Sequence, residues 1–231
     1  MVGLDSIYDE EDAIYIIMDY IPAGTLKDFI NNNGVLTERQ SFILLETLLK
    51  MLEYLNGLGI MHRDLKPENI MLRKPTISQE NLVLIDFGFS VFMSEESFEF
   101  KRCGTPGFIA PEVLCIKNGE PMYGPKCDIF SVGIIWYFCF FGSLPFYARN
   151  SNELLNKNKK VEFTFENSSK FRKIESTIKR MLQKKPNDRI DLKTALNPDF
   201  FYNILWDDDD TDEIDGGLPL INIERLNKYL I

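Results

Sequence analysis

Runs of β-branched and aromatic residues predict two pairs of short strands in the first ninety residues. Residues 14–20 (IYIIMDY) form one such run, and residues 2–8 are able to pair with it. Residues 69–73 (NIMLR) and 82–86 (LVLID) form two more, on either side of the loop 74–81. Each run is too short for an ordinary helix, so strands are the better prediction.

Between these runs, and again in the second half of the chain, the apolar period is helical. Thr25 is placed to cap a short helix that runs to Ile30. Thr37 and Gln40 form a capping box, and apolar residues then recur at helical spacing until Gly57. Further helices are predicted at 128–141, 151–157, 170–184 and 191–196.

The longest apolar run, residues 129–148, contains twenty uncharged residues and is nominally long enough to span a bilayer. Gly142, Ser143 and Pro145 interrupt it, and no basic flank follows the usual membrane pattern. A buried core helix is therefore the better prediction, and no membrane span is expected.

One polar stretch lies between two apolar segments. Residues 60–73 (IMHRDLKPENIMLR) hold the only histidine and place six strongly polar side chains within residues 62–69. Burying such groups costs free energy unless they are paired, so their concentration here suggests a functional site. Residues 86–112 follow as a long segment without periodicity, which in a compact domain is typically functional or disordered.

The negative charge is concentrated at one place in the chain. The net charge is −9, and residues 207–215 (DDDDTDEID) carry seven acids and no base. The remainder is nearly neutral and has no basic stripe, so no nucleic-acid partner is expected. The acidic run does not fit a calcium-binding loop, because the glycine and glutamate positions do not match, and a solvated surface segment is the better interpretation.

The four cysteines and the chain start suggest an intracellular, cytoplasmic protein. The cysteines form no CxxC pair, and the single histidine leaves few ligands for zinc. A reduced protein is the simplest interpretation. Residues 1–13 carry five acids and no basic n-region, so they do not resemble a signal peptide.

Three motifs in a fixed order carry the functional prediction. HRDLKPEN occupies residues 62–69, DFG occupies 86–88 and GTPGFIAPE occupies 104–112. Together they resemble the C-terminal lobe of eukaryotic serine/threonine protein kinases, and the segments around them look most like the calcium/calmodulin-dependent group. The resemblance extends over about residues 2–201.

The resemblance implies an α+β fold that is mainly α-helical. Residues 1–20 would be a remnant of the N-lobe, made of its last two strands, and residues 21–205 would form the C-lobe. Residues 206–231 would be an acidic appendage. The family's Gly-rich loop, its strand lysine and the partner glutamate have no counterpart here, which leaves open a fragment, an incomplete gene reading or a truncated protein.

The resemblance also assigns roles in phosphoryl transfer from ATP. Asp64 would accept a hydrogen bond from the substrate hydroxyl, and Lys66 would reach the γ-phosphate. Asn69 and Asp86 would bind Mg²⁺ through oxygen atoms. Thr105 would bond Asp64 and Lys66, as in kinases that phosphorylate serine or threonine.

The nucleotide base would lie between this loop and the strand at 14–20. By resemblance, Met71 and Leu26 would sandwich the adenine. Backbone groups of Asp19 and Ile21 would bond its edge, and Met18 would be the gatekeeper.

Other motif residues are expected to be structural. His62 would pack on Phe87, and Glu112 would form a buried ion pair with Arg189. Asp128 would cap the central helix while holding the backbone near His62.

Two functions remain open at this stage. The first is an ATP-dependent kinase that phosphorylates serine or threonine in a protein substrate. The second is a non-catalytic, kinase-derived binding or scaffold module, which the missing N-lobe parts favour. A Gly-rich loop and a lysine encoded upstream of Met1 would decide for the first. Neither the substrate sequence, the oligomeric state nor calcium dependence follows from the sequence.

Overall fold

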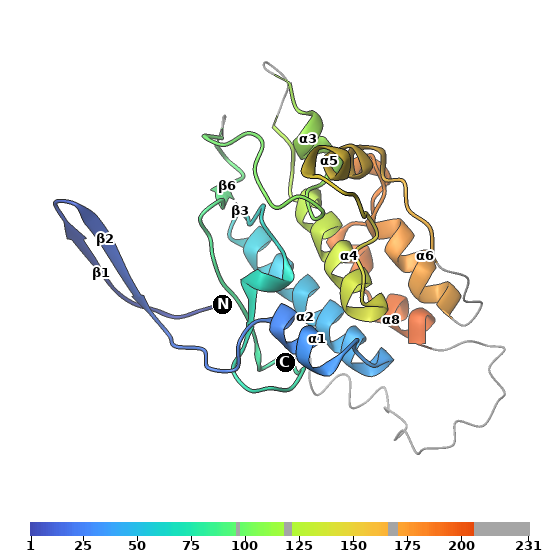
Figure 1. Ribbon diagram of the computed structural model, residues 1–231, viewed down its shortest axis with the longest axis horizontal. Coiled ribbons are helices and arrows are strands. Elements are labelled where there is room, and N and C mark those ends of the chain that lie inside the picture. Colours follow the sequence, from blue (N-terminus) through green and yellow to red (C-terminus); the bar gives the residue numbers. More distant parts are fainter. Residues whose placement is uncertain (96–97, 118–121, 166–170, 206–231) are drawn as a thin grey trace.

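The computed structural model describes residues 1–95, 98–117, 122–165 and 171–205. Figure 1 shows a helical body from which one N-terminal β-hairpin projects. The chain has a mixed α/β architecture, in which helices form the core and the sheets are short two-stranded pairs. The acidic run and the rest of residues 206–231 lie outside the described part.

The hairpin consists of β1 (Leu4–Glu10) and β2 (Ala13–Met18), which pair antiparallel. The predicted pairing is confirmed, although β1 begins and ends two residues later than predicted and β2 ends two residues earlier. Nearly every residue of both strands is exposed, because the hairpin extends away from the helices (Figure 1). Its two faces therefore lack the packing that normally stabilises a two-stranded sheet.

Helices α1 (Leu26–Asn33) and α2 (Glu38–Gly57) both begin with a capping box. Thr37 and Gln40 form the predicted box, and α2 ends at Gly57 as predicted. Helix α1 runs three residues past the predicted end and stops at Gly34, whose φ of 81° suits glycine. At its start, Thr25 pairs with Asp28 in a second box.

Two small sheets position the polar stretch. Strands β4 (Ile70–Leu72) and β5 (Leu82–Leu84) pair antiparallel around the predicted loop, and both are largely buried. Strand β3 (Ile60–Met61) pairs with β6 (Val91–Phe92), which lies inside the segment predicted to be irregular. A 3₁₀ turn, Pro67–Asn69, joins the polar stretch to β4.

Helix α4 (Lys126–Phe141) is the centre of the core. It is buried on almost all sides and packs between α2 and α6 (Arg172–Met181). Gly133 permits the close approach of α6, since a Cβ there would lie 2.9 Å from the Cβ of Met181. The prediction of a core helix is confirmed, and Gly142 ends it in a left-handed conformation. None of the helices within the described part is long and apolar enough to cross a membrane.

The remaining helices surround α4 and the end of the irregular segment. The prediction for α5 (Ser151–Lys160) ended three residues early, and α7 (Leu192–Ala195) is one residue shorter at each end than predicted. All four cysteines are free. The further elements are α3 (Pro111–Cys115), the 3₁₀ turn Pro186–Asp188, α7 (Leu192–Ala195) and α8 (Pro198–Leu205).

Candidate active site

The polar loop is anchored to the central helix by Asp128. This side chain is 1% exposed, and its two carboxylate oxygens accept the backbone N–H groups of His62 and Arg63, each at 2.8 Å. Burial raises the pKa of the Asp128 carboxyl, whereas these N–H donors act in the opposite direction. The predicted hold on the backbone near His62 is confirmed. The predicted capping of α4 is wrong, because Pro125 is the N-cap and both oxygens of Asp128 are used by the loop.

His62 connects the polar loop to the DFG motif. Its ring lies 5.0 Å from the ring of Phe87, and its Nε2 is 3.1 Å from the carbonyl oxygen of Ile85. His62 is completely buried. The expected packing on Phe87 is therefore confirmed, and it places the residue before Phe87, Asp86, close to the polar loop.

Three side chains from two distant segments form a closed cluster. Lys66 Nζ lies 2.7 Å from Asp64 Oδ2 and 3.0 Å from Thr105 Oγ1. Thr105 in turn donates to Asp64 Oδ1 at 2.7 Å. Asp64 is 5% exposed, and these donors offset the cost of burying its charge. Because an ammonium group has three protons, Lys66 keeps one donor for a further anion.

Asn69 and Asp86 lie on two segments that a backbone hydrogen bond joins. The Asn69 amide donates to the backbone oxygen of Asp64 at 2.9 Å and to its Oδ2 at 3.3 Å, which leaves the amide oxygen of Asn69 for a ligand. The Asn69 carbonyl accepts the N–H of Ile85 at 3.0 Å, so Asp86 is the next residue along. Asp86 is exposed and has a φ of 61°. An amide oxygen and an exposed carboxylate fit Mg²⁺, which takes few protein ligands and keeps waters or phosphate oxygens.

The predicted base-binding residues lie around the start of α1 and the foot of the hairpin. Met71 is partly buried and forms a backbone bridge with Thr25. Leu26 is completely buried and Ile21 is 4% exposed, whereas Met18 is 48% exposed. With its side chain in the core, Leu26 presents no surface to a ligand in this conformation. Leu26 can therefore act on the adenine only by supporting a neighbour such as Met71, and the predicted direct contact is not available in this conformation.

Asp19, the fifth of these residues, holds the chain start. Its backbone N–H donates to the carbonyl of Gly3 at 2.9 Å, and its Oδ2 accepts the Gly3 N–H at 3.2 Å. Its carboxylate also lies 3.7 Å from Arg73. The backbone role predicted for Asp19 in base binding remains a prediction.

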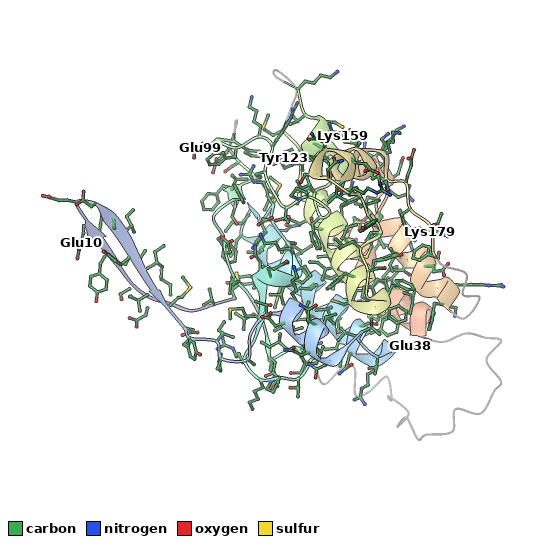
Figure 2. The ribbon with its side chains drawn as sticks, viewed as in Figure 1. Glu10, Glu38, Glu99, Tyr123, Lys159 and Lys179 are labelled. Atoms are coloured by element: carbon green, nitrogen blue, oxygen red, sulfur yellow. The ribbon has the colours of Figure 1, made fainter. Side chains whose placement is uncertain are left out.

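Arg63 and Tyr123 form a buried contact that the sequence did not reveal. Arg63 Nη1 donates to the Tyr123 hydroxyl at 2.9 Å and to the Phe100 carbonyl at 2.8 Å. Its Nε donates to the Phe89 carbonyl at 2.6 Å, and its guanidinium lies over the Phe98 ring. Burial raises the pKa of the Tyr123 hydroxyl, which keeps it protonated. Figure 2 labels Tyr123, near the labels of Glu99 and Lys159.

Replacing Tyr123 with phenylalanine is expected to lower the free energy of unfolding by about 1–3 kcal/mol, because a buried guanidinium loses one acceptor. Urea unfolding followed by circular dichroism measures the change. Tyr147→Phe is the matched control, since Tyr147 is 78% exposed. Equal losses in the two variants would mean that the Arg63 contact contributes nothing.

Glu112 and Arg189 form the expected buried ion pair. Arg189 Nη1 lies 2.7 Å from Glu112 Oε1, and Nη2 lies 2.9 Å from Oε2. Arg189 is 2% exposed. This bidentate pair joins the start of α3 to the chain after α6. Its role is structural, and it does not belong to the cluster of Asp64, Lys66 and Thr105.

Known proteins have sequences that are related to this chain. The chain matches the protein kinase domain family over residues 1–201. It is 36% identical over 210 residues to a probable serine/threonine-protein kinase 2 of Plasmodium falciparum, which covers 90% of this chain and 40% of the relative. It is 32% identical over 200 residues to a probable myosin light chain kinase of Dictyostelium discoideum, and this match covers 85% of this chain and 63% of the relative.

A third relative is an SNF1-related protein kinase catalytic subunit alpha of Arabidopsis thaliana, which is 36% identical over 200 residues. The match covers 86% of this chain and 38% of that relative. The chain thus spans 38% to 63% of the length of these relatives. All three are named as kinases. Because the family match runs through the first 201 residues and includes the whole cluster around Asp64, the chain belongs to the protein kinase domain family.

Proposed function

We propose that this chain is the C-terminal catalytic lobe of a serine/threonine protein kinase, which transfers the γ-phosphate of ATP to a protein hydroxyl. The observation that carries the proposal is the closed cluster of Asp64, Lys66 and Thr105, with Asn69 bonded to it. We further propose residues 1–20 as the remnant of the N-lobe, 21–205 as the C-lobe and 206–231 as an acidic appendage.

Each side chain of the cluster has a chemical task in this proposal. Asp64 accepts the proton of the substrate hydroxyl, whose oxygen attacks the γ-phosphorus while ADP leaves. Lys66 uses its remaining donor to neutralise charge on the transferred group. Thr105 holds both side chains in position. Mg²⁺, held by Asn69 and Asp86, would supply neutralisation of the phosphate charge.

The choice of serine or threonine as acceptor rests on two supports. Lys66 and Thr105 occupy the positions that characterise this subclass in the resemblance, and they are bonded to one another here. The Plasmodium relative carries the same designation in its name. Met18, Asp19, Ile21 and Met71 are proposed as the base-binding side of the same site, with the buried Leu26 supporting them from the core.

Binding of Mg·ATP tests the proposal on the chain itself. A ligand at 100 times its dissociation constant stabilises the native state by about 2.7 kcal/mol, which raises the unfolding temperature by a few degrees. We expect such a rise with Mg²⁺ present and its loss in Asp86→Ala. The exposed Asp12, in the hairpin turn, provides the matched control Asp12→Ala. A well-folded chain without a Mg²⁺-dependent shift would contradict a nucleotide site in this lobe.

A second candidate function, a non-catalytic binding module, is favoured by the hairpin. Its large apolar side chains are between 46% and 65% exposed, which is unusual for a surface without a partner. The absence of a Mg·ATP shift, together with a folded chain, would favour this function over catalysis. The residues concerned are Leu4, Ile7, Tyr8, Ile14, Tyr15, Ile16, Ile17 and Met18.

A further inference from the structure

A basic hollow lies where the segment after DFG approaches the end of α3. It has a volume of about 450 Å³, and its lining consists of Lys101, Arg102, Ile116 and Lys117. Ile116 is buried, whereas Arg102 and Lys117 are exposed. Within the described residues, the lining therefore combines one apolar residue with three cations.

The arginine in this hollow is held in place but is not neutralised. Arg102 Nη2 donates to the carbonyl of Ile116 at 2.7 Å, so the two sides of the hollow are joined. The other N–H groups of the guanidinium form no hydrogen bond within the described part of the chain. In the same part, no carboxylate forms an ion pair with Lys101 or Arg102. Glu99, labelled in Figure 2, is two residues from Lys101 but does not line the hollow.

The hollow is within reach of a peptide bound at Asp64. Arg102 precedes Thr105 by three residues, and Thr105 donates to Asp64. Three residues of chain span at most about 11 Å, so Arg102 lies within about that distance of Thr105 from Cα to Cα. An extended peptide advances about 3.3 Å per residue. A peptide whose hydroxyl meets Asp64 therefore reaches the hollow within a few positions.

We propose that this hollow binds an anionic side chain of the protein substrate, a few positions from the acceptor hydroxyl. The inference rests on the proposed function, because it takes Asp64 as the place where the hydroxyl binds. A carboxylate or a phosphate provides the chemistry, since the guanidinium and ammonium groups bond either one. The proposal thus assigns acidic or previously phosphorylated substrates to this chain.

Fluorescence polarisation with labelled peptides tests the proposal on the full chain. Each peptide carries a central serine in a neutral host, with glutamate, phosphoserine or lysine placed at one position before or after it. We expect glutamate or phosphoserine to bind about tenfold more tightly than lysine at one or two adjacent positions. The glutamate and phosphoserine series together show which anion the hollow prefers. The preference should weaken at high salt.

Charge reversal of the lining, Lys101→Glu with Arg102→Glu, should remove this preference. The matched control is Lys184→Glu with Lys185→Glu, which changes the net charge equally at two exposed lysines outside the hollow. Should charge reversal impair folding, Lys101→Ala with Arg102→Ala serves instead, and thermal unfolding checks each variant. A preference that survives in the lining variant, or that is lost equally in the control, would overturn the proposal.

The same preparations separate this inference from the proposed function. The Mg·ATP shift does not depend on Lys101 or Arg102, so it should persist in the lining variants. A retained shift without any anion preference would overturn the basic hollow as a substrate site and leave the kinase proposal standing. Absence of the shift would count against the kinase proposal itself. Failure of every peptide to bind would also overturn the inference.

Discussion

Replacing Arg189 with methionine is expected to lower the free energy of unfolding by about 3–5 kcal/mol, because it breaks a buried ion pair from one side. The Arg189 guanidinium also donates to the carbonyls of Gln183 and Lys126, at 2.9 Å and 2.6 Å. It lies over the ring of Phe130 as well. Its loss leaves a carboxylate, Glu112, and two carbonyls without their donors.

Denaturant unfolding of wild type and variant measures this loss. Arg149→Met is the control, since Arg149 is exposed and a change there should stay within about 0.5 kcal/mol. The double variant Arg189→Met with Glu112→Gln should lose less than the sum of the two single changes, because no unpaired buried charge remains. A loss below about 1 kcal/mol in Arg189→Met would mean that the pair contributes little more than a surface ion pair.

Replacing Asp128 with alanine is expected to cost about 2–5 kcal/mol of stability, because two buried backbone N–H groups lose the carboxylate that accepts them. These N–H groups belong to His62 and Arg63, which directly precede Asp64. We therefore expect the Mg·ATP shift to disappear together with the stability. Few other single changes would affect both the core helix and the proposed active site.

Two further variants serve as an intermediate case and a control for this second prediction. Asp128→Asn keeps one carbonyl oxygen as an acceptor, so its loss of stability should lie between wild type and Asp128→Ala. Asp199→Ala removes an exposed carboxylate and should change stability by no more than about 0.5 kcal/mol. Denaturant unfolding and the thermal shift with Mg·ATP provide the two measurements. An Asp128→Ala chain that keeps both stability and the shift would show that the loop does not depend on this anchor.

Local sequence signals predicted the local structure well. The capping box at Thr37, the end of α2 at Gly57 and the pairing of β4 with β5 all depend on residues that are close in the chain. The motif residues around Asp64 were predictable in part for the same reason, since His62 to Asn69 lie close together within one loop. At the end of α1, where the boundary differs from the prediction, the helix stops at Gly34.

The sequence by itself thus determined the order of the longer helices, the core helix and the membership of the cluster at Asp64. Only the tertiary structure decided how distant segments meet. The Arg63–Tyr123 bond joins residues 60 positions apart, and the hollow lies between two segments that no periodic pattern connects. Helix α4 is apolar on all sides, so its pattern cannot indicate which neighbours it contacts. Close packing of whole elements sets these contacts, which is why a pattern read along one element does not contain them.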